Sequence, residues 1–368
     1  MVAAFIAGLG GIVRPPTAQV APREVAAAAS APAGRPLPTS TLGDLPRAVA
    51  LPLLAACCHG IGRRVARKRT LRRARVLRTA LSAEDLEVLV KGAEGGDQES
   101  QYQLGRMYLV GDGVERDPAL AASWLTKAAE GGNATAQYNL GMMYMAGEGA
   151  EENPKEGARW LKMAAEQGEA AGQYFYGQML LEGEPDAGVE RDAGEGIMYL
   201  RAAAEQDMVE AQYLVGSILL NTPEEATEEK EWAAYWFTKA AEKKHPGSLY
   251  QVGRMWFYGT APMEQDFEKA ANWISAAANE GDPDGQYLMG TMLLGGHGVE
   301  KNLEWAAHWF RESAQQGNVD AQYNFGLMLE AGDGVPADPE QAAFWLEAAA
   351  SQGDQEAAEV KLEVGKGN

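Results

Sequence analysis

The sequence repeats one phrase seven times, and the dipeptide Gln-Tyr marks six of the copies. Successive copies are 36, 36, 39, 37, 37 and 36 residues apart, counted between Tyr102, Tyr138, Tyr174, Tyr213, Tyr250, Tyr287 and Tyr323. Leu249 takes the place of the glutamine in the fifth copy. A fixed period of this length is typical of a supersecondary unit that stacks on its neighbours. The period therefore predicts a repeat solenoid, and it favours binding over catalysis as the function.

Each copy predicts two helices separated by turns. In the first copy, Tyr102, Leu104 and Met107 recur at the spacing of one helical face. Gly111 follows them, and glycine accepts the left-handed conformation that commonly ends a helix. Asp117 and the proline after it begin a second helix, because the carboxylate caps free amides and proline suits the first helical position. The other copies share this pattern, so we expect an all-α chain of helical hairpins.

A glycine recurs inside the first helix of every copy. These residues are Gly105, Gly141, Gly177, Gly216, Gly253, Gly290 and Gly326. Glycine inside a helix costs about 1 kcal/mol relative to alanine. Because every copy bears this cost, we expect two helices to approach each other closely at each glycine.

The copies resemble the Sel-1-like repeat, a relative of the tetratricopeptide repeat. The shared phrase reads A-x-Q-Y-x-L-G-x-M-Y-x-x-G-x-G-V-x-x-D-x-x-x-A-x-x-W-x-x-x-A-A-x-x-G, and residues 136–168 match it almost position for position. The resemblance covers residues 84–368 and implies a right-handed superhelical α-solenoid whose first helices line a concave face. It also implies that the usual role is to bring other proteins together. We expect about seven repeats, with a lone capping helix at residues 84–96 and another at residues 355–364.

Charge divides the chain into two segments, residues 1–80 and 81–368. The first holds thirteen basic and two acidic residues, a formal charge of +11, and the second holds nineteen basic and fifty acidic residues, a formal charge of −31. The acidic segment argues against nucleic-acid binding by the repeats, which would need a basic surface. Its acids form either a solvated outer face that keeps the solenoid soluble or a surface that selects a basic protein partner.

Residues 1–80 are rich in alanine, proline and arginine and poor in acids, a composition typical of an organellar transit peptide. We therefore expect a disordered leader that directs the chain to a plastid or a mitochondrion. A disordered basic tail of a cytoplasmic protein and a two-part leader, with residues 2–13 as its first part, are alternatives. A further alternative is that residues 63–78 form a basic helix that binds the acidic repeats, nucleic acid or anionic lipid. The apolar run at residues 48–58 is too short to span a bilayer, so we expect no transmembrane segment.

The sequence offers no constellation for catalysis, for a cofactor or for a metal. The two cysteines, Cys57 and Cys58, are adjacent and lie in the leader. None of the four histidines has another histidine or a cysteine at i+3 or i+4, and these residues are His59, His245, His297 and His308. The recurrent Gly-Asp-Gly-Val turn lacks the alternating ligands of a calcium loop. A cysteine-stapled bacterial branch of the family includes members with assigned β-lactam hydrolysis, but these repeats contain no cysteine, so the resemblance does not extend to that activity.

Candidate partner-binding residues lie on the first helices, at positions that vary while the repeat pattern stays fixed. They are arginines, methionines or aromatic residues, namely Arg106, Tyr108, Met142, Tyr144, Arg254, Trp256 and Phe257. Aromatic residues and arginine dominate interface energetics, and methionine adapts its shape to a partner. The alternative is that Trp256 and part of the segment 142–145 belong to the core between repeats.

The repeats between residues 183 and 262 depart from the common pattern. The third copy has a longer turn at residues 183–192, and the fourth replaces its glycine turn with residues 221–227. Long surface loops are tolerated at little cost, and this is the explanation that we favour. Alternatively, the irregular turns build a specific site.

The complete repeat pattern, without a catalytic constellation, leads us to expect a non-enzymatic adaptor that holds other proteins inside an organelle. One alternative is a stable structural subunit of a larger complex. Another is a hydrolase built on the repeat groove, for which the sequence offers no catalytic residues.

Overall fold

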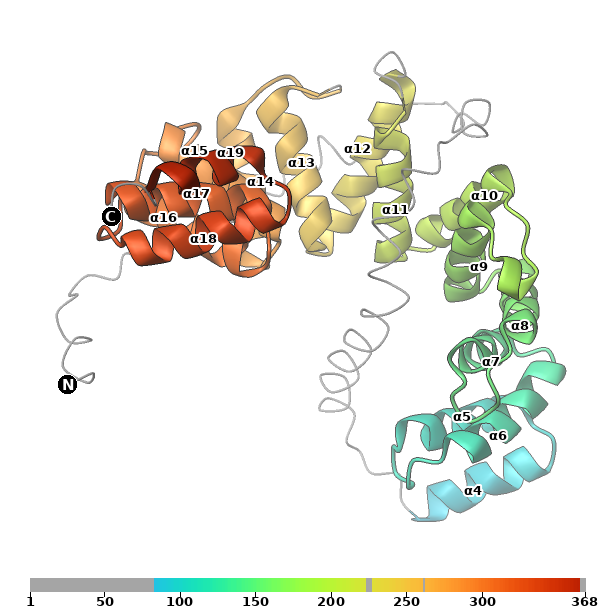
Figure 1. Ribbon diagram of the computed structural model, residues 1–368. Helices are drawn as coiled ribbons and strands as arrows, with labels where there is room; N and C mark the ends of the chain where they lie inside the picture. Colours follow the sequence, from blue (N-terminus) through green and yellow to red (C-terminus); the bar gives the residue numbers. More distant parts are fainter. Residues whose placement is uncertain (1–82, 223–226, 261, 365–368) are drawn as a thin grey trace, which may run out of the picture. The chain divides into compact units, whose positions relative to one another are not determined.

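The computed structural model describes residues 83–222, 227–260 and 262–364, and in these residues the chain is built from α-helices (Figure 1). They form two compact units, one within residues 83–221 and one within residues 222–364. The predicted transit peptide at residues 1–80, and Cys57 and Cys58 with it, lie outside the described residues. None of the described helices is both long enough and apolar enough to cross a lipid bilayer.

Both units are stacks of helices joined by short turns (Figure 1). The first unit contains α4 (Ala83–Glu94), α5 (Gln98–Val110), α6 (Pro118–Glu130), α7 (Ala134–Ala146), α8 (Pro154–Glu166), α9 (Ala170–Glu182), the 3₁₀ helix η3 (Pro185–Ala187), α10 (Ala193–Glu205) and α11 (Val209–Leu220). The second contains α12 (Thr227–Glu242), α13 (Pro246–Tyr258), α14 (Phe267–Asn279), α15 (Pro283–Gly295), α16 (Leu303–Gln315), α17 (Val319–Ala331), α18 (Pro339–Ser351) and α19 (Gln355–Val364). Within each unit, a helix packs mainly against its neighbours in sequence, as in a repeat solenoid. The predicted all-α solenoid is confirmed, and α4 and α19 are the expected lone end helices.

The helix ends follow from the turn and cap residues. The Asp117 carboxylate accepts a hydrogen bond from the Leu120 amide at 3.0 Å, and Pro118 lies in the first turn of α6. Helix α5 ends at Gly111, whose φ of 78° is in the left-handed region and whose amide donates to the Met107 carbonyl oxygen at 2.8 Å. Turn and cap geometry therefore explain the Gly-Asp-Gly-Val motif.

The glycine inside each first helix permits close packing of a hairpin. A Cβ atom added to Gly141 on α7 would lie 2.9 Å from Leu161 Cγ and 3.0 Å from the backbone oxygen of Gly157, both on α8. The same addition at Gly290 would place a Cβ 2.8 Å from the Phe310 ring. A Cβ at Gly105, Gly177, Gly253 or Gly326 would be equally crowded, so the predicted close approach is confirmed at six of the seven glycines.

The glutamine of the Gln-Tyr pair joins consecutive repeats. Gln137 is buried, and its Nε2 donates to the carbonyl oxygen of Ala129, near the end of the preceding repeat, at 3.1 Å. Its Oε1 accepts a hydrogen bond from Nε2 of Gln167, near the end of its own repeat, at 2.6 Å. The same two bonds recur at Gln173, Gln286 and Gln322. Because a buried amide is stable only when its polar atoms are paired, this residue is part of the repeat architecture.

In each unit, one pair of first helices from successive repeats approaches more closely than any pair of second helices does. Helix α7 contacts α9 in the first unit, and α13 contacts α15 in the second. Among the described helices, no two second helices of successive repeats come equally close. The first helices therefore line the inner side of each stack, the side on which solenoids generally bind partners.

Candidate interaction surface

One tyrosine on a first helix of each unit, Tyr138 in the first and Tyr250 in the second, lies in the electrostatic field of nearby carboxylates. Burial, and then the charges of Glu169 and Glu210, raise the pKa of Tyr138 to about 12. In the second unit, burial outweighs the charge of Arg254 and, together with Asp284, raises the pKa of Tyr250 to about 12. Glu169 and Asp284 belong to the repeats that follow these tyrosines. Each hydroxyl therefore stays protonated at neutral pH and lies near a carboxylate of the next repeat.

We use the term first-helix face for the side of the first helices that carries the repeated tyrosine. It also includes the neighbouring carboxylates and the residue one helical turn after each tyrosine. Three predicted binding residues, Arg106, Met142 and Arg254, occupy that last position. Arg106 is exposed, and the guanidinium carbon of half-buried Arg254 lies 5.9 Å from the centre of the Tyr250 ring. These three residues are therefore placed where a partner segment would reach them.

The other four predicted residues lie deeper in the hairpins. Tyr108 and Tyr144 pack against one hydrophobic cluster of the first unit. Trp256 packs against the core of the second unit, and Lys269 Nζ lies 4.3 Å from the centre of its ring. Phe257 packs edge-on against Phe267, with ring centres 5.1 Å apart. All four are partly buried and contribute to core packing.

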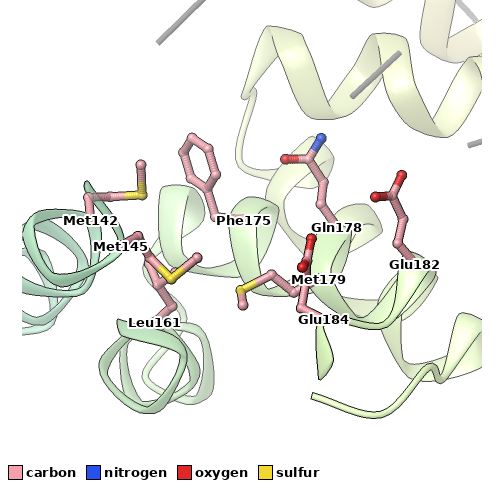
Figure 2. Close-up of a pocket in the computed structure, with 8 residues that line it drawn as sticks. All are labelled: Met142, Met145, Leu161, Phe175, Gln178, Met179, Glu182 and Glu184. Carbon is pink, nitrogen blue, oxygen red and sulfur yellow. The ribbon is translucent and has the colours of Figure 1, made fainter. Parts of the chain in front are cut away.

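A cavity of about 80 Å³ opens between the first helices α7 and α9 of the first unit (Figure 2). Its apolar walls come from both first helices, its floor is Leu161 of α8, and its polar rim comes from α9 and the turn after it. The lining residues are Met142, Met145, Leu161, Phe175, Gln178, Met179, Glu182 and Glu184. Pockets for drug-sized ligands and cofactors measure roughly 300–1,000 Å³, so this cavity suits a single side chain.

Two carboxylates line the polar side of this cavity. Figure 2 shows Met142 and Met145 on the left, Glu182 on the right and Glu184 between them, beside Met179. Oε1 of Glu182 is buried and has no hydrogen-bond partner within the described residues. Burial raises the pKa of the Glu182 carboxyl, and the charge of Glu184 raises it further. Within the described residues, this side of the cavity therefore lacks a hydrogen-bond donor for Glu182 Oε1 and a positive charge to balance the two carboxylates.

The longer turn of the third repeat supplies Glu184. A backbone bridge between Glu184 and Val189 closes this turn, and Ala187 and Val189 are buried against a cluster that includes Leu161. The turn is thus packed onto α8, which fixes the start of the turn beside the cavity. This placement is compatible with the alternative that the irregular turn builds a site.

The equivalent place in the second unit, between α13 and α15, has different side chains. Phe257 occupies the position of Met145, while Gly295 and His297 occupy those of Glu182 and Glu184. The His297 ring lies 6.1 Å from the Phe257 ring and 5.2 Å from the Phe267 ring, measured between centres. The second unit therefore has an aromatic cluster where the first has carboxylates.

The described residues contain no group of three or more His, Cys, Asp or Glu side chains placed to hold a metal ion. His245 has a structural role, because its Nδ1 accepts a hydrogen bond from the Ser248 amide at 3.2 Å and caps α13. His297 lies in the aromatic cluster described above.

Sequence reasoning selected Met142 but missed Phe175, Met179, Glu182 and Glu184. One signal was present in the sequence, because Glu182 is the only acid at its position in the seven copies. The equivalent residues are Val110, Ala146, Asn221, Tyr258, Gly295 and Ala331.

Comparisons with known proteins agree with this architecture. The Sel1 repeat family matches seven consecutive segments, residues 98–133, 134–169, 170–208, 209–245, 246–282, 283–318 and 319–354. The fold is similar to the crystal structure of c5321, a protective antigen of uropathogenic Escherichia coli strains that displays an SLR fold. That similarity has a TM-score of 0.69 and 30% identity over 77% of this chain and 60% of the other. The chain thus spans 60% of the length of the E. coli protein.

A second similar structure is a Sel1 repeat protein from Oxalobacter formigenes, with a TM-score of 0.59 and 28% identity over 90% of this chain and 98% of the other. A comparison with curated proteins gave no match. The seven matched segments cover most of the chain and coincide with the helical hairpins described above. The chain is therefore a member of the Sel1 repeat family.

Proposed function

We propose that this protein is a non-enzymatic adaptor whose first-helix face holds segments of other proteins. The observation that supports the proposal is that a half-buried tyrosine on a first helix of each unit lies in the electrostatic field of carboxylates from the repeats that follow it. Tyrosine combines a large apolar ring with a hydrogen-bond donor, which suits a protein interface. Membership of the Sel1 repeat family, whose repeats typically mediate protein–protein interactions, supports the same role.

We further propose that the partners are basic. Residues 81–368 carry a formal charge of −31, and carboxylates lie beside the tyrosines of the first-helix face. Complementary charge accelerates encounter and discourages wrong partners, so binding should weaken as salt concentration rises.

Site-specific photo-crosslinking in the native compartment tests the adaptor role. A photoreactive side chain replaces Arg106 on α5 or Tyr258 on α13, both exposed on first helices. The matched control replaces Met198, which is 68% exposed on the second helix α10. We expect discrete protein adducts from Arg106 and Tyr258 and none of these adducts from Met198. Adducts formed only at Met198, or none at any position, would contradict the proposal.

We propose, from composition alone, that residues 1–80 direct the protein to an organelle. Fluorescent fusions of the full chain and of residues 81–368 test this proposal. We expect the full chain in a plastid or mitochondrion and the shorter chain in the cytoplasm. The same distribution for both fusions would contradict it.

A further inference from the structure

We propose that the cavity between α7 and α9 binds a partner-protein segment in which an apolar side chain lies next to an arginine or lysine. This inference rests on the proposed function and names the chemistry of the partner at one site. The apolar side chain enters the cavity, and the cation pairs with the two carboxylates at the rim.

The apolar half of the site is built for a side chain of variable shape. Met142, Met145, Phe175 and Met179 form its walls over the buried floor residue Leu161. Unbranched methionine side chains rearrange at little cost, so the walls can adapt to an aliphatic or aromatic residue. The volume of about 80 Å³ excludes a cofactor but suits one side chain.

The two carboxylates of the site are the reason for expecting a basic residue next to the apolar one in the partner segment. A buried carboxylate oxygen without a partner is costly, and Oε1 of Glu182 is in that state. Glu184 adds a second carboxylate on the polar side of the cavity (Figure 2). A guanidinium or ammonium group from a partner would supply both the missing donor and the missing charge, in charge-assisted hydrogen bonds.

Among the seven repeats, only the third has the combination of residues that forms this site. The third repeat alone has an acid at the position of Glu182 and an aromatic residue at the position of Phe175. In the preceding repeat, the turn position equivalent to Glu184 is Glu148, and that carboxylate pairs with Arg116. An ion pair within the chain thus satisfies Glu148, whereas the Glu182 oxygen has no such partner in the described residues.

Selection from a random peptide library displayed on phage tests the inference with the full chain. We expect the enriched peptides to share an apolar residue beside arginine or lysine. Because a hydrogen bond to a charged group contributes about 1.5–3 kcal/mol, the E182Q/E184Q variant should bind the selected peptides at least about tenfold more weakly. The matched control E148Q removes a carboxylate from the equivalent turn position and should bind them as the wild type does.

A second variant keeps the test independent of folding defects. In Q178K, the new lysine is four residues before Glu182 on α9, which is the spacing of a helical ion pair. It supplies the missing cation from within the chain. Because Gln178 is buried and its Nε2 donates to the Tyr174 hydroxyl at 3.3 Å, denaturation checks that the variant is folded; we expect it to remain folded and to lose the selected peptides.

Four outcomes would overturn the inference. One is enrichment of peptides without basic residues, and another is equal binding by wild type and E182Q/E184Q; both leave the adaptor role intact. The third is that a synthetic peptide of residues 63–78 displaces the selected peptides and that removal of residues 1–80 makes the protein bind the selected peptides more tightly. This result would show that the chain's own segment occupies the cavity. If no peptide is enriched, this site is wrong, and photo-crosslinking at Arg106 and Tyr258 still decides the adaptor role separately.

Discussion

The junction between the second and third repeats and the junction between the fifth and sixth repeats both pair two first helices, but they differ in side chains and in the turn after the later helix, which is longer in the third repeat. In the first unit, Met145 and its neighbours leave a cavity, and Glu182 and Glu184 stand at its rim. In the second unit, Phe257 takes the methionine position, and the ring of His297 takes the place of a rim carboxylate. A glycine inside the first helix keeps each hairpin tight in both units.

This difference indicates which positions a Sel1 repeat leaves free for specialisation. The floor and the buried glutamine bonds recur because each repeat must pack on the next. The wall position of Met179 also belongs to that packing, since it is a buried methionine in six of the seven copies, whereas the positions of Met142, Phe175, Glu182 and Glu184 vary from copy to copy. We therefore expect the variable wall and rim residues to determine which partner binds, and the floor residues to determine the stability of the fold.

The largest expected effects come from truncating the floor of each junction. Leu161→Ala and Ile274→Ala should each reduce the free energy of unfolding by about 2–5 kcal/mol, because both side chains are fully buried. Hydrogen exchange measured by mass spectrometry should show reduced protection of the backbone amides mainly in α7–α9 for L161A and in α13–α15 for I274A. Equal loss in both units from either substitution would contradict the description of two separately compact units.

The second prediction compares the buried acids that cap α9 and α15. Burial raises the pKa of Asp282 to about 6, above its ordinary value of 3.8, so the folded state binds a proton that the unfolded state does not between these pH values. The cost of the charged carboxylate is therefore present above pH 6 and is lost as pH falls toward 4. At 1.36 kcal/mol per pKa unit, Asp282→Asn should stabilise the chain at pH 7 by up to about 3 kcal/mol.

Asparagine preserves the cap in this variant, since Asn133 and Asn318 cap α7 and α17 in the same way. Burial also raises the pKa of Glu169, which caps α9, so Glu169→Gln should likewise increase the free energy of unfolding at pH 7. Urea denaturation at pH 5 and pH 7 measures both effects. A D282N variant less stable than the wild type at pH 7 would show that the charged form is the stabilising one.

The third prediction transfers the cavity chemistry to the second unit. The substitutions F257M, G295E and H297E place a methionine and two carboxylates at the equivalent positions between α13 and α15. We expect calorimetric titration with a selected basic peptide to change from one site per chain to two. F257M alone should still give one site, because it adds no carboxylate. A single site in the triple variant, with α13–α15 still protected from exchange, would show that the two junctions are not interchangeable.

The smallest expected effect concerns the surface ion pair between Arg116 and Glu148. Both side chains are about half exposed, at 54% and 42%, and exposed pairs typically contribute less than about 1 kcal/mol. Glu148→Gln should therefore change the free energy of unfolding by about 0.5 kcal/mol or less, and less still at high salt. Thermal unfolding at two salt concentrations measures this change, and a loss above about 1 kcal/mol would show that the pair belongs to the packing of the unit.

Much of the fold could be predicted from the sequence, because its signals are local or periodic. Asp117 caps a helix through contacts within three residues, and Gly141 recurs at a fixed place in each copy. The candidate site was harder to predict. The segment 142–145 reads as one methionine-rich strip, yet Met143 is buried in the core while Met142 and Met145 line the cavity.

The sequence by itself determined the number of repeats, the helix ends, the contact glycines and the acidic charge of the array, since each depends on residues close together or on an exact period. Tertiary structure alone decided that Met142 meets Phe175 and Glu182, because Met142 belongs to the second repeat and the other two to the third, and they come together only when α9 stacks beside α7. It also decided that Oε1 of Glu182 has no hydrogen-bond partner within the described residues, since burial and the absence of a donor depend on the surrounding side chains. A period specifies how one repeat packs on the next, whereas the chemistry of a groove depends on which variable side chains that packing brings together.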